Sequence, residues 1–262
     1  MGLNKSGSEV CGRAIGLNSL AIFVPSYNAA RTLPDIFGRI PEDLWPTIAA
    51  IFVINDGSDD DTEDVVRKLA RRWKKIRLVS HQHNSGYGAA VREGLRCCAE
   101  ETNANFIACL HADGQYPPEE LPRFAKYMAQ NEIDIIQGSR HKDGTALAGG
   151  MPKYKWLAGK VLTAMENWSF GLQMTDYHSG FLLYSRKAVR SLPFIEFSNY
   201  FDFDLEVIAS ARALGLSLAE LGIPTRYAGE RSHLNVVRYG FRCLRVMLRY
   251  RLGCYQIGST NW

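Results

Sequence analysis

The feature that most constrains the fold is a regular alternation of short apolar runs with segments of helical pattern. Apolar runs of strand length end at turn-forming residues, and the segments between them have the amphipathic spacing of helices. Such alternation predicts an α/β fold with a mostly parallel sheet whose two faces are covered by helices. The expected strands cover residues 19–24, 47–54, 76–80, 105–110 and 133–138, and the expected helices cover 32–40, 62–73, 89–100 and 117–130.

After residue 138 the regular alternation of strand and helix patterns ends. Residues 139–152 are polar and glycine-rich and predict a mobile loop. The following pattern predicts helices over 153–171 and 203–214 and strands over 181–185 and 218–223. No linker separates these elements from the first half, so we expect one domain over residues 19–235. A flexible start over 1–18 precedes it, and a basic segment over 236–262 follows it.

The basic segment has two adjacent stripes of one predicted helix, and the arginine stripe lies one position after the apolar stripe. Six arginines and one acid occur from residue 227 onward, whereas the whole chain has a net charge of +4, so the rest is nearly neutral. This pattern suits an anionic lipid surface better than nucleic acid, which is not expected as a partner. The stripes consist of Val237, Phe241, Leu244 and Leu248, and of Arg238, Arg242, Arg245 and Arg249.

Two interpretations of this helix remain open. It could contact a membrane peripherally through residues 236–252, or it could dock on the protein body and leave a solvated basic edge. No apolar run approaches the roughly 18 residues that a membrane-spanning helix needs. The six cysteines form no CxxC pair, which is typical of reduced thiols and predicts a cytoplasmic protein, at most peripheral on the cytoplasmic face of a membrane.

Polar clusters follow the first, second and fourth predicted strands, at residues 25–28, 55–60 and 111–115. Ligands of open parallel sheets bind beyond the carboxyl ends of the strands, so these clusters should converge on one rim. In extended chain Asp113 and Gln115 would point the same way and offer two oxygens to one cation. Oxygen ligands together with substrate phosphates suit Mg²⁺ or Mn²⁺, whereas a simple turn is the alternative for Asp113-Gly114-Gln115.

A glycine-rich stretch leads into the helix predicted at 89–100. Small residues at 86 and 88–90 would let backbone approach a ligand or a strand closely. The stretch is no dinucleotide fingerprint, because Val91 stands where G-x-G-x-x-G needs its third glycine, and because it follows the third strand and not the first.

Taken together, these motifs resemble the family 2 glycosyltransferases, which have the GT-A fold and use nucleotide-sugar donors with inversion. The similarity runs in order from about residue 20 to 235. The stretch at 113–118 most resembles the dolichyl-phosphate mannose synthase branch. The matching stretches are residues 24–28, 55–62, 84–90, 113–118, 138–140 and 176–181.

The resemblance implies a nucleotide-sugar half over 19–138 and an acceptor half over 139–235. In the first half, Asp56 would meet the edge of the base, and Asp113 would act in catalysis by binding, with Gln115, a Mg²⁺ or Mn²⁺ ion on the donor diphosphate. The donor would be contacted by Pro25, Tyr27, Asn28, Asp56, Asn84, Gly86, His111 and Asp113.

In the acceptor half, the resemblance implies that Arg140 and Ser179 hold an acceptor phosphate, and that Arg231 and Ser232 lie on a segment over the phosphates. A phosphate acceptor needs no general base, because it is largely a dianion at neutral pH. A hydroxyl acceptor does need one. The candidates for that catalytic base are Asp176, Asp202 and Asp204.

The chain departs from the family pattern at His111 and Asn55, where acids are usual, and in having no C-terminal spanning helix. The resemblance therefore implies an inverting enzyme that moves a hexose from a UDP- or GDP-sugar to a polyprenyl or dolichyl phosphate. A soluble sugar, glycan or natural-product hydroxyl is the alternative acceptor. His111 motivates a second alternative, a non-catalytic protein that binds nucleotide sugars.

Overall fold

A computed structural model describes residues 16, 19–144, 153–224 and 236–256. Its centre is a seven-stranded sheet. The strands are β1 (Leu20–Ser26), β2 (Ile48–Asn55), β3 (Ile76–Ser80), β4 (Phe106–Cys109), β5 (Ile135–Ser139), β6 (Leu182–Ser185) and β7 (Leu218–Gly222).

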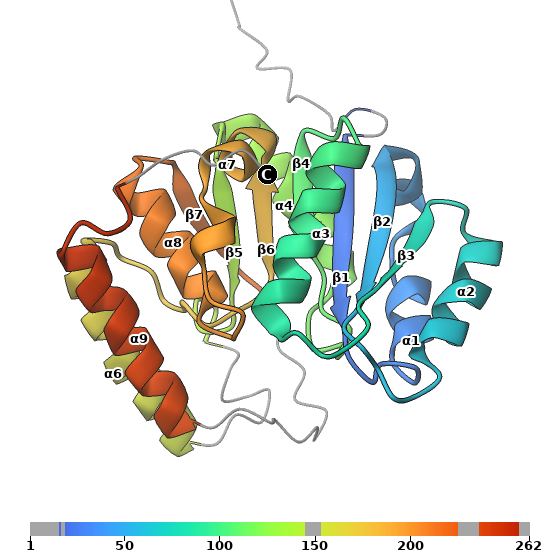
Figure 1. Cartoon of the computed structure of the whole chain (residues 1–262). Coiled ribbons are helices and arrows are strands. Elements are labelled where there is room, and N and C mark those ends of the chain that lie inside the picture. Colours follow the sequence, from blue (N-terminus) through green and yellow to red (C-terminus); the bar gives the residue numbers. More distant parts are fainter. Residues whose placement is uncertain (1–15, 17–18, 145–152, 225–235, 257–262) are drawn as a thin grey trace, which may run out of the picture.

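The strands lie in the order β3-β2-β1-β4-β6-β5-β7 (Figure 1). Six of them are parallel, and β6 runs antiparallel between β4 and β5. The carboxyl ends of the parallel strands and the amino end of β6 therefore share one edge of the sheet. This arrangement confirms the predicted α/β fold with a mostly parallel sheet.

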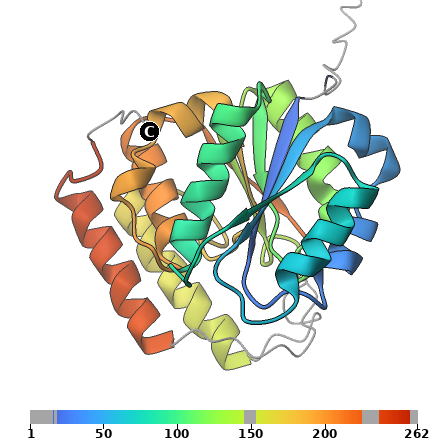
Figure 2. The same ribbon diagram turned by 45° about the vertical axis from the view of Figure 1, so that its right-hand side comes forward.

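Helices cover both faces of the sheet, as Figure 2 shows. The α-helices are α1 (Leu33–Gly38), α2 (Thr62–Arg72), α3 (Tyr87–Glu101), α4 (Leu121–Asn131), α6 (Lys153–Phe170), α7 (Arg186–Ser191), α8 (Phe203–Ala213) and α9 (Val236–Arg251). Short 3-10 helices span Glu42–Thr47, Pro118–Glu120 and Phe194–Glu196. The sequence pattern predicted the longer helices, but not α7, which follows β6 without a turn.

Two apolar cores follow from the alternation of side chains along the strands. In β1, Ala21 and Phe23 belong to the core that includes α3, α7 and α8. Leu20, Ile22 and Val24 face the other core, which includes α1, α2 and α4. Burial on both faces explains why the strands read as continuous apolar runs.

The two long helices α6 and α9 pack against each other beside the sheet, and α9 also packs on α8 (Figure 1). Buried Cys243, Val246 and Met247 form the docking face of α9. Arg242 pairs with Asp202 at 3.1 Å, and other polar contacts reinforce the same junction. Of the two interpretations of this helix, docking on the protein body is thus observed.

The basic stripe of α9 is not simply a solvated edge, since Arg249 also pairs with Glu206 of α8, at 2.6 Å. The predicted apolar stripe faces outward instead, and Phe241 is 70% exposed. The helix α6 exposes a second apolar stripe, on which Trp168 is 77% exposed. The exposed apolar stripes are Leu157, Val161, Met165 and Trp168 of α6, and Val237, Phe241, Leu244 and Leu248 of α9. No helix in the described ranges could cross a membrane.

Candidate functional site

The first two polar clusters meet at the carboxyl edge of the sheet, because β1 and β2 are neighbours in register, with Ser26 opposite Asn55. Asn28 has a positive φ of 50° and joins the two loops. Its backbone N–H donates to Ser58 Oγ at 2.9 Å, and its Oδ1 accepts from Asp59 N–H at 2.9 Å. Tyr27 next to it is exposed, and its contact with a nucleotide stays a prediction.

Asp56 is buried at the end of β2 and holds the loop that opens α3. Its Oδ1 accepts from Ser85 N–H at 2.8 Å and contacts His81 Nδ1 at 2.7 Å, and its Oδ2 accepts from Gly86 N–H at 2.9 Å. The carboxylate therefore shapes the loop that carries exposed Asn84. Pro25, near the end of strand β1, and Asp56 lie at the same edge of the sheet, and their contact with a nucleotide stays a prediction.

The glycines at the start of α3 allow another backbone segment to approach closely. Gly86 has φ 98°, and a Cβ there would lie 2.4 Å from Asn199 O. A Cβ at Gly88 would lie 2.2 Å from Ser198 O, and Gly88 N–H donates to Asn199 O at 2.9 Å. The segment that approaches is thus the loop before α8, and a contact of Gly86 with a ligand stays a prediction.

Tyr87 lies between these glycines and links two predicted site residues. Its hydroxyl donates to Asp204 Oδ2 at 2.8 Å and lies 3.1 Å from His111 Nε2. The imidazole packs so tightly on Gly180 that a Cβ there would lie 2.2 Å from Nε2. This ring nitrogen of His111 therefore faces the protein interior.

Burial shifts the pKa values of the two side chains that Tyr87 connects. Asp204 is 7% exposed in the first turn of α8, and burial raises its pKa to about 7, against the hydrogen bond from Tyr87. Burial lowers the pKa of His111, with the Asp113 carboxylate opposing the shift. A carboxyl group that titrates near neutral pH has the property that a general base requires.

Asp113 lies in a turn, so the predicted extended geometry is wrong. Gln115 N–H donates to Asp113 Oδ1 at 3.0 Å, and Gly114 adopts φ 72° between them. The turn uses one carboxylate oxygen, and no residue in the described ranges hydrogen-bonds to the other. No two further His, Cys, Asp or Glu side chains join Asp113 there to form a cluster. A cation at Asp113 would therefore depend on donor phosphates, which is usual for Mg²⁺.

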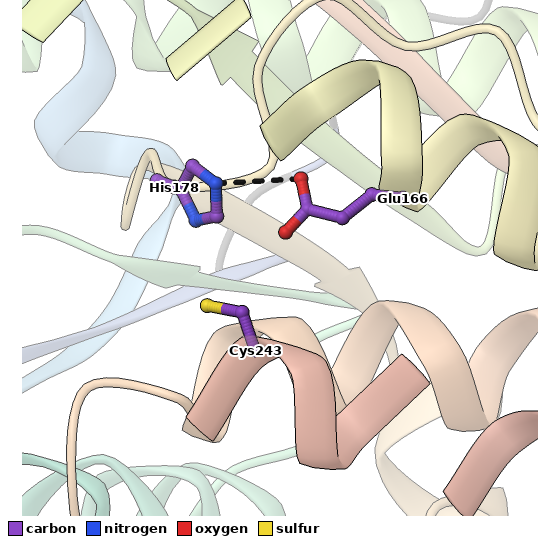
Figure 3. A group of neighbouring side chains, drawn as sticks. All are labelled: Glu166, His178 and Cys243. Atoms are coloured by element: carbon purple, nitrogen blue, oxygen red, sulfur yellow. Dashed lines mark ion pairs between the residues drawn. The ribbon is translucent and has the colours of Figure 1, made fainter. Parts of the chain in front are cut away.

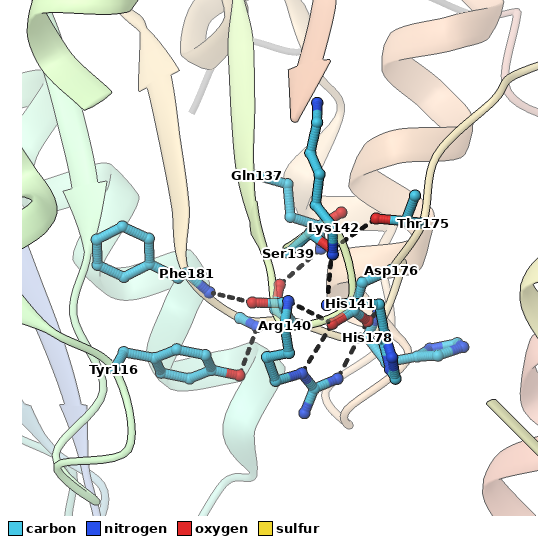
Figure 4. A network of polar contacts seen from close by, with 12 residues as sticks. Tyr116, Gln137, Ser139, Arg140, His141, Lys142, Thr175, Asp176, His178 and Phe181 are labelled. Atoms are coloured by element: carbon cyan, nitrogen blue, oxygen red, sulfur yellow. Dashed lines mark hydrogen bonds and ion pairs between the residues drawn. The ribbon is translucent and has the colours of Figure 1, made fainter. Parts of the chain in front are cut away.

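Arg140 follows β5 and forms a bidentate ion pair with Asp176 (Figure 4). Its Nε and Nη2 donate at 2.7 and 3.1 Å to the two oxygens of the carboxylate. Burial favours the neutral acid, but Arg140 and the His178 N–H hold the pKa of Asp176 well below its usual range. Asp176 is thus an ionised partner that fixes the arginine, and this placement argues against its role as a base.

Asp202 and Ser179 are also poorly placed for their predicted roles as base and as phosphate ligand. Asp202 is buried, accepts from Ser198 Oγ at 2.8 Å and pairs with Arg242, so it joins α8 to α9 and is poorly placed as a base. Ser179 has 0% exposed surface, so its side chain cannot contact an acceptor phosphate in this conformation. Arg231 and Ser232 lie outside the described residues.

Sequence reasoning missed several polar residues of this edge. Tyr87 was hidden inside a glycine motif, where its position between two glycines was the available signal. Tyr239, in the first turn of α9, contacts His178 Nδ1 through its hydroxyl at 2.9 Å. That contact connects α9 to the segment 176–180, and only tertiary structure reveals it.

Comparison with known proteins identifies relatives over most of the chain. The family model described as Glycosyl transferase family 2 matches residues 21–192. An undecaprenyl-phosphate mannosyltransferase of Micrococcus luteus is 27% identical over 245 residues, which cover 88% of this chain and 97% of that protein. A dolichyl-phosphate beta-glucosyltransferase of Trichomonas vaginalis is 25% identical over 254 residues, covering 89% and 72%.

Solved structures agree in fold. Glucosyl-3-phosphoglycerate synthase from Mycobacterium tuberculosis, in complex with UDP, superposes with a TM-score of 0.66 at 18% identity, covering 89% of this chain and 80% of that one. A complex of the same synthase with Mn²⁺, UDP and phosphoglyceric acid gives a TM-score of 0.61 at 17% identity, covering 90% and 79%.

Proposed function

The chain belongs to glycosyl transferase family 2 and has the GT-A fold, and from this membership we propose that it transfers a hexose with inversion to a polyprenyl phosphate. The donor is a UDP- or GDP-sugar, and the transfer takes place at the cytoplasmic face of a membrane. The relatives from Micrococcus luteus and Trichomonas vaginalis, which are named for lipid phosphates, support the choice of acceptor.

The observation that carries the proposal is the pair of exposed apolar stripes on α6 and α9. Both helices begin on the side of the sheet where the carboxyl ends of the strands lie (Figure 1). The first turn of α9 contacts His178, two residues beyond Asp176, which holds Arg140. A bilayer that buries these stripes would thus bring a lipid phosphate close to Arg140.

Each part of the edge has a role in this proposal. The loops around Tyr27, Asn28 and Asp56 bind the nucleotide, while Asn84, Gly86 and His111 line the donor site. Asp113 holds Mg²⁺ or Mn²⁺ together with the donor phosphates, without the second oxygen that Gln115 would supply in extended chain, and the ion would neutralise the charge that develops on the leaving diphosphate. Mn²⁺ beside UDP in a structural neighbour supports this choice of cofactor.

On the acceptor side, Arg140 binds the phosphate through its guanidinium, which Asp176 holds in place. Guanidinium groups suit phosphate because they are planar and always charged. The phosphate oxygen then attacks the anomeric carbon without a base, since a phosphate monoester is already largely a dianion. Ser179 has no direct role in this proposal, because its side chain is enclosed.

A soluble hydroxyl acceptor is the second candidate. The complexes of the structural neighbour with phosphoglyceric acid support this class of acceptor. This chemistry needs a base, and Asp204, with a pKa of about 7, is then the preferred group over Asp176 and Asp202. A non-catalytic role is less favoured, because the family is one of transferases.

Transfer assays distinguish these functions. Labelled UDP- and GDP-sugars would be incubated with Mn²⁺ and either undecaprenyl or dolichyl phosphate, or soluble sugars and phosphoglycerate. Label in the organic phase is expected, and its loss in Asp113→Ala would attribute it to this site. Label that reaches only aqueous products would support the second candidate, and no turnover with any pair would overturn the catalytic proposals.

Membrane contact has its own test, with vesicles that contain anionic phosphatidylglycerol. The double variant Phe241→Glu, Leu248→Glu should sediment with vesicles at least about 10-fold less, because each buried apolar side chain contributes roughly 1.5–3 kcal/mol. Tyr127→Glu on α4, also at an exposed aromatic position, is the matched control. Equal binding of both variants would show that the stripe on α9 does not contact the membrane. The proposal of a lipid acceptor would then lose its main support.

A further inference from the structure

A cluster of three largely buried groups lies where α6, α9 and the segment before β6 meet (Figure 3). Glu166 comes from α6, His178 from the segment and Cys243 from α9. Their ligand atoms all lie within 4.8 Å of one another. Glu166 and Cys243 are fully buried, and the His178 side chain is 15% exposed.

The hydrogen bonding of this cluster is incomplete. Neither carboxylate oxygen of Glu166 has a hydrogen-bond partner among the described residues, and the same is true of His178 Nε2. The cluster's internal ion pair joins His178 Nε2 and Glu166 Oε2 at 3.3 Å. A buried carboxylate normally requires several donors, and Glu166 has only this one pair in the described part of the chain, so the site could accommodate a cation.

The orientation of His178 is fixed from the other side. Its Nδ1 contacts the Tyr239 hydroxyl at 2.9 Å, which leaves Nε2 directed at Glu166. Histidines that bind metals have this arrangement, in which one ring nitrogen is held by a hydrogen bond and the other faces the ion.

We propose that Glu166, His178 and Cys243 bind a zinc ion. A mixed set of thiolate, imidazole and carboxylate is typical of Zn²⁺, whereas Mg²⁺ and Mn²⁺ prefer oxygen. The Cys243 thiol proton and any proton held by His178 Nε2 or Glu166 are released to solvent on binding, and thiolate plus carboxylate then balance the charge of the ion. This site differs in chemistry from the oxygen site proposed at Asp113, and it does not depend on the identity of the acceptor.

The consequence of zinc binding is structural. The ion joins α6 and α9, the two helices with exposed apolar stripes, to the segment that carries Asp176. It would therefore stabilise the relative placement of the apolar stripes and of Arg140. Removal of zinc should loosen this junction without direct effect on the nucleotide loops.

The first test measures zinc in the purified full chain by mass spectrometry after a brief EDTA wash and reloading with one equivalent of Zn²⁺. We expect about one zinc per chain. The variants Cys243→Ser and Glu166→Gln should retain less than about a tenth of it. Cys98→Ser is the matched control, because Cys98 is an equally buried thiol on α3 outside the cluster, and it should bind zinc like the original chain.

The second test replaces zinc by Co²⁺ and records the thiolate-to-cobalt charge-transfer absorption in the near ultraviolet. The original chain and Cys98→Ser should show this band, and Cys243→Ser should not. Absence of the band in the original chain, or its persistence in Cys243→Ser, would overturn the proposal. The first of these outcomes decides the matter even where a variant fails to fold.

Discussion

Tyr87 at the start of α3 donates a hydrogen bond to Asp204 in the first turn of α8, over a distance of 2.8 Å. The two residues are far apart in sequence, yet this bond joins the glycine-rich loop to the first turn of α8. It also places a carboxyl group with a raised pKa beside His111. The pair therefore links the protonation of Asp204 to the geometry of the glycine-rich loop.

The first prediction concerns the stability of the fold at different pH values. In the unfolded chain Asp204 titrates near its ordinary value of 3.8, and in the folded chain near 7. The folded state thus holds the proton more tightly, and the stabilisation is fully present below pH 4 and lost as the pH rises to 7. Since one pKa unit is ~1.4 kcal/mol, the loss is at most about 4 kcal/mol. Urea unfolding at pH 5 and 8 measures it.

Asp204→Asn is the informative variant, because the amide keeps an acceptor for Tyr87 but cannot ionise. Its free energy of unfolding should fall less between pH 5 and 8 than that of the original chain. Asp35→Asn, at an exposed carboxylate of α1, should leave the pH dependence unchanged. An identical pH profile for Asp204→Asn and the original chain would contradict the raised pKa.

The second prediction concerns metal-dependent nucleotide binding. With Mn²⁺, UDP or GDP at 100 times its dissociation constant should stabilise the chain by about 2.7 kcal/mol. Asp113→Asn should lose most of this shift, because the proposed ion then lacks its carboxylate ligand. Thermal unfolding with and without Mn²⁺ measures the effect, and Asp35→Asn again serves as control. A full shift in Asp113→Asn would place the ion elsewhere.

The third prediction separates two roles of Arg140. Arg140→Gln leaves Asp176 as a buried, unpaired charge, so we expect a loss of roughly 3–5 kcal/mol in the free energy of unfolding. The double variant Arg140→Gln, Asp176→Asn should recover most of that stability. It should nevertheless keep a KM for the acceptor raised at least about 10-fold, since a lost charged contact costs ~1.5–3 kcal/mol. Normal acceptor kinetics in the double variant would limit Arg140 to a structural role.

The fourth prediction tests the close approach at the start of α3. A Cβ at Gly88 would meet Ser198 O at 2.2 Å, so Gly88→Ala should destabilise the chain by about 2 kcal/mol or more. Gly159→Ala is the matched control, because nothing lies within 4 Å of a Cβ at that helical position of α6. It should be neutral or stabilise by up to about 1 kcal/mol. Similar effects of both variants in urea unfolding would refute the steric explanation.

Much of the fold could be predicted because local signals and tertiary structure agree. Strands such as β2 combine β-branched apolar residues with a sharp stop at Asn55-Asp56-Gly57, and they appear where the pattern indicated them. The antiparallel insertion of β6 could not be predicted, since nothing in residues 182–185 encodes its neighbours. The short helix α7 was missed because it follows β6 directly, so no turn residue separates its pattern from that of the strand.

The site was harder to predict because its roles depend on partners distant in sequence. Three of the predicted site residues are aspartates, at positions 176, 202 and 204. The first two pair with arginines, whereas Asp204 accepts a hydrogen bond from a tyrosine. Only tertiary structure assigns these partners and so separates the three carboxylates. The stripes of α9 were identified correctly as a pattern, but helical periodicity does not say which stripe faces the protein.

The position of β6 in the sheet also determines which strands can pair while the chain is being synthesised. While the ribosome adds residues 110–181, β4 has β1 on one side, and its other edge lacks the strand that will occupy it, because β6 begins only at Leu182. An unpaired apolar edge is a template for association with other chains. A nascent chain that stalls in this interval is therefore open to such association, whereas one that has emerged beyond Ser185 can pair β6 with β4, and β7 later completes the sheet beside β5.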